Sequence, residues 1–447
     1  MGFLFVGNTV ILKSSNVQMR TSTIQTIHNP VRFKQQLLHW AQQFREVVYL
    51  DSNDYGQQYT SYDAVLAVDA LTSIKTDYHN AFEDINVYQQ TTRDWLFGYF
   101  AYDLKNDTED LSSNNFDGLQ FPDLFFFQPK KIFLLTGNQV EMQYLAMCDD
   151  EMEGDMLEIV NSKSQITNSK SQIAIQQRIS KESYLEKVGE MLTHIHRGDI
   201  YEANFCMEFF AEDTGIEPLA TYNKLNAISE PPFAVFFKNY GQYLLSASPE
   251  RYLRKEGDKI ISQPIKGTAR RSPDIKEDEA IKQELAANEK ERSENIMIVD
   301  LVRNDLSRTA AKGSVEVEEL CGAYTFKQVH HLISTVASSL KEDCTPVDAI
   351  RTTFPMGSMT GAPKISAMQI IEKLEETRRG LYSGAVGYFT PEGDFDFNVV
   401  IRSILYNEEN KYVSFSVGSA ITAKANPEME YEECLLKARA MRSVLED

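Results

Sequence analysis

The sequence predicts an α+β fold in which antiparallel sheet is prominent, and three observations support this class. Ser180 can cap a helix that ends at Gly198, and a strand-like run follows at 199–210. Asn426 as cap and Pro427 as first helical residue begin a final helix. Between them, the turn signals PEGD and NEEN separate three runs of strand-forming residues, as in an antiparallel meander: 382–390, 397–406 and 411–422.

The preceding part of the chain has similar but shorter signals. Strand-like runs such as EVVYLDSN and WLFGYFAYDL predict a mixed N-terminal region dominated by sheet, residues 1–160. The hexapeptide NSKSQI then occurs twice, which predicts a polar surface linker over 161–177 before a C-terminal region at 178–447. Residues 1–18 share no pattern with the rest of the chain, so Met19 is a candidate for the true start.

Composition argues against several classes of protein. The chain has 447 residues, 42% hydrophobic content and a formal net charge of −20, which predict a packed globular protein that binds neither nucleic acid nor an anionic membrane. Its five cysteines are scattered without CxxC spacing, which favours reduced thiols over disulfides or a zinc site. No signal peptide, myristoylation signal or membrane-spanning run is recognisable, so a cytoplasmic protein is expected.

Two Glu-x-x-Glu pairs suggest a metal site. Glu291 and Glu294 precede one apolar run, and Glu430 and Glu433 precede another. On a helix, each pair presents both carboxylates to one face. Such a pair is usually solvated surface in an acidic chain, but like charges near a core need a cation, and open oxygen coordination suits Mg²⁺. Lys437 follows on the same face as Glu430 and could meet an anionic group of a ligand.

The stretch FPMGSMTGAPK is typical of an anion site. It is rich in glycine, and we expect Thr360 to cap a helix with Pro363 in its first turn, which leaves free amides for a carboxylate or phosphate. A P-loop is excluded, because the Gly-x-x-x-x-Gly-Lys-Ser/Thr pattern is absent. Arg402 lies in the strand expected at 397–406, where apolar neighbours make its charge costly, so it forms either a structural ion pair or a clamp for a carboxylate.

In their order along the chain, the motifs resemble the chorismate-utilising enzyme family. This family includes component I of anthranilate synthase and of aminodeoxychorismate synthase and, more distantly, isochorismate and salicylate synthases. The resemblance covers 180–440 and rests on GDIYEANF, SASPERYL, PIKGTARR, KERSENIMIVDLVRNDLSR, VHHLISTV, FPMGSMTGAPK, RRGLYSGAVGY, FNVVIRS and PEMEYEECLLKA. The N-terminal region matches loosely, through YLDSN and FGYFAYD. The resemblance implies a sandwich of two antiparallel β-sheets flanked by helices, formed by both regions together.

The turn PIKGT indicates the branch of the family. The aminodeoxychorismate branch typically has lysine where the anthranilate branch has alanine, so Lys266 resembles a covalent nucleophile that attacks C2 of chorismate while the C4 hydroxyl leaves. Ammonia then attacks C4 and expels the lysine. The amine must be neutral, and burial beside a metal and arginines is expected to lower its pKa. Glu250 in SASPERYL matches the acid that protonates the leaving hydroxyl, and His331 matches the family's active-site histidine, whereas His330 is expected to be incidental.

The resemblance also implies the ligands of metal and substrate. Glu294 and Glu433 would bind Mg²⁺ directly, and Glu291 and Glu430 would bind it through water. The ring carboxylate of chorismate would lie on the metal, with Lys437 and the loop amides near Gly418. The pyruvyl carboxylate would meet Arg402 and Tyr382. The remaining pocket residues implied are Gly267, Thr268 and Ser358.

Two positions depart from the family. Glu202 stands where aminating relatives usually have glutamine and isochorismate synthases have a lysine that activates water. The absence of that lysine argues against water as nucleophile, and Glu202 either attracts ammonium or pairs with a neighbour. Ala420 replaces a second glycine in VGSAIT, which changes how the backbone can approach the substrate carboxylate.

No glutaminase signature is recognisable, so the resemblance implies ammonia from a partner, a glutamine amidotransferase subunit called component II. Two rivals remain. Anthranilate synthase component I is disfavoured by Lys266, which would occupy the carbon to be aminated. A non-catalytic chorismate-binding regulatory subunit is disfavoured by the retained acid and metal positions. Ser52 in YLDSN resembles part of a tryptophan site of some relatives, and whether this chain binds tryptophan stays open.

Overall fold

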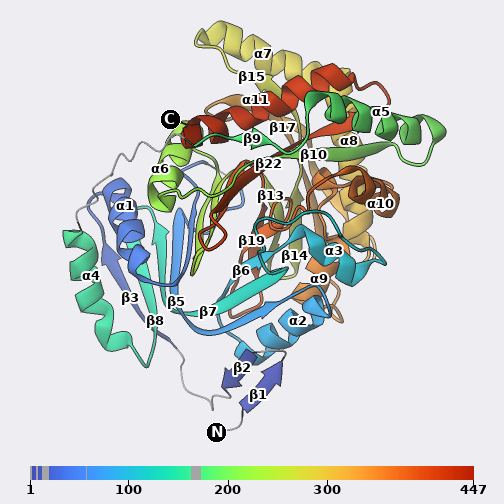
Figure 1. The fold of residues 1–447 in the computed structure, drawn as a ribbon. Helices are drawn as coiled ribbons and strands as arrows, with labels where there is room; N and C mark the ends of the chain where they lie inside the picture. Colours follow the sequence, from blue (N-terminus) through green and yellow to red (C-terminus); the bar gives the residue numbers. More distant parts are fainter. Residues whose placement is uncertain (1–2, 7–8, 13–19, 57, 163–172, 447) are drawn as a thin grey trace.

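The computed structural model describes residues 3–6, 9–12, 20–56, 58–162 and 173–446. Its helices are α1 (Pro30–Trp40), α2 (Ala81–Thr92), α3 (Lys105–Thr108), α4 (Met152–Asn161), α5 (Lys181–Arg197), α6 (Pro218–Ser229), α7 (Ile275–Ala287), α8 (Glu289–Ser307), α9 (Pro346–Thr353), α10 (Lys364–Leu374) and α11 (Pro427–Glu446), with short 3₁₀ turns η2 (Tyr102–Leu104) and η4 (Gly357–Met359) (Figure 1). Its strands are β1 (Phe3–Val6), β2 (Thr9–Leu12), β3 (Arg20–Thr26), β4 (Glu46–Asp51), β5 (Ala64–Thr76), β6 (Leu96–Phe100), β7 (Leu124–Thr136), β8 (Gln139–Leu145), β9 (Gln176–Gln177), β10 (Glu202–Ala211), β11 (Phe233–Asn239), β12 (Gln242–Ser248), β13 (Arg251–Glu256), β14 (Lys259–Gln263), β15 (Ile265–Arg270), β16 (Glu316–Thr325), β17 (Val329–Ser339), β18 (Gly361–Ala362), β19 (Ala385–Phe389), β20 (Phe395–Val399), β21 (Ser403–Asn407) and β22 (Tyr412–Thr422).

The predicted α+β class with antiparallel sheet is confirmed. Strands β3 to β22 form one network of antiparallel pairs that closes on itself, and helices flank it. The two halves of the chain interleave in this network: β4 pairs with β5 on one side and β11 on the other, and β6 lies between β7 and β19. The N-terminal and C-terminal regions therefore build the same sheet structure.

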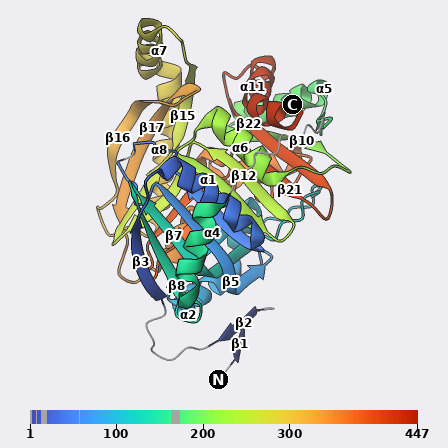
Figure 2. The same cartoon turned by 90° about the vertical axis from the view of Figure 1, so that its left-hand side faces the viewer.

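Side chains on the two faces of the strands enter two hydrophobic cores. On β4, Val47 and Tyr49 belong to one core while Val48 belongs to the other, as the two-residue period of a strand requires. The first core packs strands against α1, α4, α5, α6, α10 and α11. The second packs the opposite faces against α2, α8 and α9. Helix α7 projects beyond both, at the top of the two views (Figure 2).

The residues predicted to begin or end the helices before and after the meander do so in the structure. The Ser180 hydroxyl accepts a hydrogen bond from the amide of Ser183 at 3.2 Å, and Gly198 ends α5 with φ +90°. Asn426 Oδ1 accepts from the amide of Glu428 at 3.0 Å, where α11 begins. The strand that follows α5, β10, pairs with β22 along its whole length.

Two sequence predictions about local structure are wrong. The strand expected at 397–406 is interrupted at Arg402, whose φ of +50° is left-handed. This turn lets β20 pair with β13 and β19 while β21 pairs with β12 and β22. Thr360 does not cap α10, because its hydroxyl faces the carbonyls of Met356 and Gly357, and Pro363 occupies the cap position just before the helix.

Some predictions fall outside the described residues. Of the predicted linker at 161–177, residues 163–172 are not described, and β9, which lies inside the predicted bounds, pairs with β10. Of 1–18, only β1 and β2 are described, and they pair with each other. The five cysteines are free thiols, as predicted. Among the helices described here, none has the length and apolar character needed to cross a membrane.

Candidate active site

The predicted nucleophile Lys266 lies at the centre of the site, on β15. Its side chain is 13% exposed, and its Nζ lies 2.7 Å from Oε1 of Glu202 on β10. Of the two roles left open for Glu202, pairing with a neighbour is therefore what the structure shows. The carboxylate holds the amine in one orientation.

The pKa of Lys266 is shifted opposite to the sequence prediction. Burial alone would lower it, but the ion pair with Glu202 and the charges of Glu294 and Glu433 outweigh burial and raise it above 10.5. The sequence predicts neighbouring cations, whereas the protein groups that act on the amine are the carboxylates of Glu202, Glu294 and Glu433. Lys266 is charged in this arrangement and must lose a proton before it can act as a nucleophile.

Glu250 lies between β12 and β13 and is 5% exposed. Burial raises its pKa from 4.5 to about 7, and Ser358, the amide of Ile265 and the charge of Lys266 limit the rise. A cavity of about 20 Å³ adjoins Glu250 and Ser358, which is room for about one water molecule. A carboxyl group with this pKa is available as a proton donor near neutral pH.

His331 and Arg402 form a second part of the site. Arg402 Nη2 lies 3.4 Å from Nε2 of His331, while Nδ1 of His331 lies 3.0 Å from Thr268 Oγ1 and 3.3 Å from the carbonyl of Gly267. Because arginine only donates, Nε2 accepts and Nδ1 holds the proton. Burial and the Arg402 cation lower the pKa of His331 to about 3, so its ring is neutral.

Arg402 is a part-buried cation. Burial lowers its pKa, and no carboxylate of the described residues forms an ion pair with it. The alternative of a structural ion pair is thus not observed. A part-buried guanidinium without an ion-pair partner among the described residues is suited to bind an anionic group of a ligand.

The four glutamates predicted to bind metal come from two helices. Glu291 of α8 approaches Gly267, since a Cβ at that glycine would lie 3.2 Å from its Oε2. The charges of Glu294 on α8 and Glu433 on α11 both raise the pKa of Lys266. Burial raises the pKa of Glu294 itself. Glu430, 8% exposed, accepts a hydrogen bond from Ser419.

These carboxylates have the chemistry of a hard-cation site. Glu433 is paired with Lys437 at 2.7 Å, and Lys437 also donates to the carbonyl of Gly418 at 2.9 Å, so those three predicted residues lie together. In the described part of the chain, no three His, Cys, Asp or Glu side chains are already arranged around one point as ligands. The oxygen donors fit Mg²⁺ in type, and Lys290 and Lys437 partly compensate their charge.

Tyr382 is buried beside Cys206. It is 3% exposed, and its hydroxyl is 3.8 Å from Sγ of Cys206. Among the described residues, no hydrogen bond joins it to Arg402. The predicted joint clamp of Arg402 and Tyr382 on one carboxylate is therefore not preformed.

Several supporting residues were missed by sequence reasoning. Arg379, buried against Glu375 at 2.7 Å, donates to the carbonyls of Met359 and Asn204. It thereby joins η4, which bears Ser358, to β10, which bears Glu202. The i,i+4 spacing of Glu375 and Arg379 is the local signal that could have indicated this pair.

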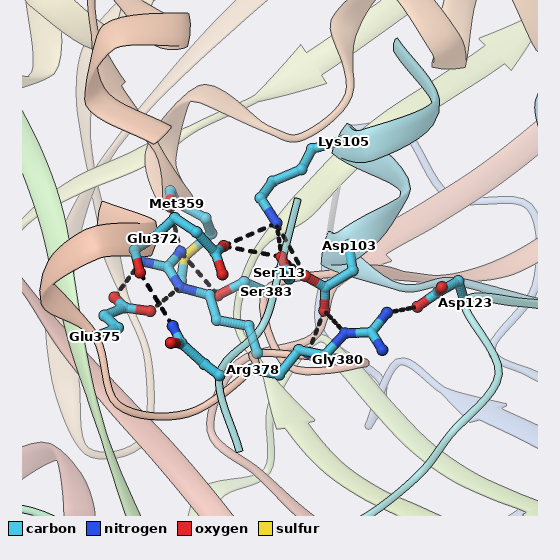
Figure 3. A network of polar contacts seen from close by, with 12 residues as sticks. Asp103, Lys105, Ser113, Asp123, Met359, Glu372, Glu375, Arg378, Gly380 and Ser383 are labelled. Carbon is cyan, nitrogen blue, oxygen red and sulfur yellow. Dashed lines mark hydrogen bonds and ion pairs between the residues drawn. The ribbon is translucent and has the colours of Figure 1, made fainter. Parts of the chain in front are cut away.

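A neighbouring polar network joins the two halves of the chain (Figure 3). Asp103 of η2 lies 2.9 Å from Lys105 and 3.1 Å from Arg378, and Lys105 lies 3.2 Å from Glu372 of α10. Both members of the Asp103–Lys105 pair are at most 1% exposed. Because a buried ion pair is costly to break, this network fixes the segment after α10 that leads to Arg379.

The fold brings three kinds of group to one site: an arginine without an ion-pair partner among the described residues, a buried acid, and a lysine among carboxylates. The family profile described as chorismate binding enzyme matches residues 35–443. The chain is 35% identical over 357 residues to an anthranilate synthase component I-like protein of Synechocystis sp., which covers 79% of this chain and 72% of that protein. It is 39% identical over 271 residues to aminodeoxychorismate synthase component 1 of Escherichia coli, covering 61% and 59% respectively.

The crystal structure of anthranilate synthase component I from Streptococcus pneumoniae has the same fold, with a TM-score of 0.76, 24% sequence identity, and coverage of 87% of this chain and 95% of that one. The chain belongs to the chorismate binding enzyme family.

Proposed function

We propose that this chain is component I of aminodeoxychorismate synthase and converts chorismate and ammonia to 4-amino-4-deoxychorismate. The observation that supports this branch is Lys266, a part-buried amine held by Glu202 and adjacent to Glu250, an acid whose pKa is raised. A lysine at this point provides a nucleophile that the anthranilate branch lacks.

The first half of the reaction needs a base, a nucleophile and an acid. Glu202 Oε1, 2.7 Å from Nζ, is the acceptor for the proton that Lys266 must release. Neutral Nζ then attacks C2 of chorismate, the two conjugated ring double bonds shift, and the C4 hydroxyl leaves as water after it takes the proton of Glu250. The ionised Glu250 takes the extra proton of the adduct nitrogen, and Glu202 releases to water the proton that it took from Lys266. In the second half, ammonia forms the C4–N bond and the electron pair of the C2–N bond returns to the lysine.

Binding of the dianionic substrate uses separate groups. Arg402, oriented by neutral His331, is proposed to bind the pyruvyl carboxylate. Lys437, beside Gly418, is proposed to contact the ring carboxylate. Mg²⁺ held by Glu294 and Glu433, with Glu291 and Glu430 behind water, would supply positive charge to that same carboxylate.

Ammonia is proposed to come from a glutamine amidotransferase partner, because the sequence has no recognisable glutaminase signature. Glutamine alone should then give no product with this chain. A second candidate is anthranilate synthase component I, which the 35% identity to the Synechocystis protein favours. A non-catalytic subunit of the same family would show no turnover at all.

One incubation separates these functions. The purified chain is given chorismate, Mg²⁺ and an ammonium salt, and the products are separated and identified by mass spectrometry and fluorescence. 4-Amino-4-deoxychorismate supports the proposal, anthranilate supports the second candidate, and unchanged chorismate in the presence of folded protein supports the non-catalytic subunit. A parallel incubation with glutamine in place of ammonium tests the need for a partner.

A further inference from the structure

Glu202 uses only one of its two oxygens. Oε1 accepts from Lys266, whereas Oε2 is buried and has no hydrogen-bond partner among the described residues. The residue is 2% exposed. An ionised carboxylate oxygen that is out of water and without a donor is costly, so its presence indicates a ligand that donates there.

The backbone fixes the position of this carboxylate. Glu202 pairs with Thr422 on β22 and with Ala362 on β18, so it is held between two strands. A Cβ at Gly361 would lie 2.2 Å from the carbonyl of Glu202, which shows how closely the chain approaches from that side. The side chain therefore stays directed to Lys266 on β15.

The charges around Glu202 favour a cationic donor. Lys266 contacts Glu202 from β15. The negative charges of Glu294 on α8 and Glu433 on α11 act on the same lysine. The donor must also be small, because the lysine amine already occupies one side of the carboxylate. In the proposed reaction, the species that fits both conditions is the second nucleophile in its ammonium form.

We propose that Glu202 Oε2 binds ammonium and removes one of its protons; this inference rests on the proposed function. Ammonium gives a proton to the carboxylate and becomes ammonia. Ammonia attacks C4 of the lysine adduct, and the C2–N bond breaks. The protonated Glu202 gives its proton to the departing lysine nitrogen, so Lys266 leaves as a neutral amine, the product bears a C4 ammonium group, and Glu202 is again ionised. Lys266 then takes one proton from water, which restores the resting ion pair. Glu202 is thus a catalytic residue of both half-reactions.

The test compares wild type with Glu202→Gln, which keeps the size of the side chain but cannot take a proton. At saturating chorismate and Mg²⁺, kcat/KM for total ammonia is measured between about pH 7 and 8.5. Wild type, which uses ammonium, should change less than about threefold over this range. Glu202→Gln, which can use only free ammonia, should be at least tenfold lower at the acidic end and rise about tenfold per pH unit.

Glu208→Gln is the matched control, because Glu208 is also a buried glutamate of β10 but pairs with Arg178 and Tyr412. Its kcat/KM for total ammonia should change with pH as in wild type. The inference is overturned if wild-type kcat/KM for total ammonia also rises tenfold per pH unit, or if Glu202→Gln changes kcat/KM for chorismate but leaves kcat/KM for total ammonia as in wild type. The wild-type profile decides the matter even if the variant does not fold. Absence of any aminated product from wild type would instead overturn the proposed function.

Discussion

Asn295 Nδ2 donates to the main-chain carbonyl of Lys266 at 3.2 Å. Asn295 directly follows Glu294 on α8, is 1% exposed, and also donates to the carbonyl of Leu332 on β17 at 3.3 Å. One amide therefore joins the helix that bears a predicted metal ligand to the strand that bears the predicted nucleophile and to a neighbouring strand. The relative positions of Lys266 and Glu294 depend on it.

Replacing Asn295 by alanine should destabilise the protein by about 2–3 kcal/mol. The change removes the bonds to two carbonyls and leaves the Ser334 hydroxyl, which donates to Asn295 Oδ1 at 2.5 Å, without its partner in a buried place. Urea unfolding monitored by circular dichroism measures the loss. Arg303→Ala, on the exposed face of the same helix, should stay within about 0.5 kcal/mol of wild type. Equal values for the two variants would contradict the role of Asn295.

Glu250 should impose an alkaline limit on activity. Its folded-state pKa is raised to about 7 by burial, and a general acid must be protonated to act, so the active form is lost as pH rises through this value. At saturating Mg²⁺, kcat/KM for chorismate should fall about tenfold per pH unit above roughly pH 7. Glu250→Gln should be at least about a hundredfold slower and should lose this limb. A variant that retains the limb would assign it to another group.

The elements that could be predicted depend on neighbours in sequence. Ser180, Gly198 and Asn426 act on amides and carbonyls within four residues, so their effects can be read locally. The contact between Glu202 and Lys266 joins residues 64 apart, and no local pattern specifies it. The same holds for β4, which inserts between β5 and β11.

The errors have a similar physical origin. The run FNVVIRSILY predicts a strand through Arg402, but the chain turns there so that β20 and β21 can join different partner strands. Partial burial beside a metal and the arginines of PIKGTARR predicts a lowered pKa for Lys266. Arg271 instead pairs with Asp278, away from Lys266, and carboxylates from β10, α8 and α11 surround the amine.

Removal of divalent metal should abolish turnover. EDTA should stop amination, and excess Mg²⁺ should restore it, if the carboxylates of α8 and α11 hold the ion. Glu294→Gln and Glu433→Gln should each lower activity at least about a hundredfold and remove the Mg²⁺-dependent rise in melting temperature that binding to the native state gives. Glu432→Gln, on the exposed side of α11, should keep both properties. Full activity of either Glu294 or Glu433 variant would reject the metal assignment.

Arg402 should affect substrate binding more than the chemical step. Arg402→Gln removes a part-buried cation without an ion-pair partner among the described residues. A charge-assisted hydrogen bond of about 2 kcal/mol corresponds to a rise of roughly thirtyfold in KM for chorismate. Arg178→Gln removes another part-buried arginine, but one paired with Glu208, and should leave KM unchanged. A normal KM in Arg402→Gln would mean that the pyruvyl carboxylate binds elsewhere.

Lys266 permits the sharpest separation of the two family branches. Lys266→Ala changes PIKGT to PIAGT, removes the group that blocks C2, and keeps Glu250, Arg402 and the carboxylates. Amination at C4 should fall by about a hundredfold or more, as is typical when a catalytic group is lost. At high ammonia, C2-aminated product and anthranilate are expected to form, because ammonia can then reach C2. Chromatography with mass detection distinguishes the two products.

Direct evidence for the nucleophile comes from wild type without ammonia. Intact-mass analysis after incubation with chorismate and Mg²⁺ should show an adduct, because the second half of the reaction cannot proceed, and peptide mapping should place it on Lys266. Lys259→Ala, which removes a lysine of β14 that pairs with Glu318, should still form the adduct, whereas Lys266→Ala should not. If Lys266→Ala keeps near-normal C4 amination and wild type forms no adduct, ammonia attacks chorismate directly and the lysine only orients the site.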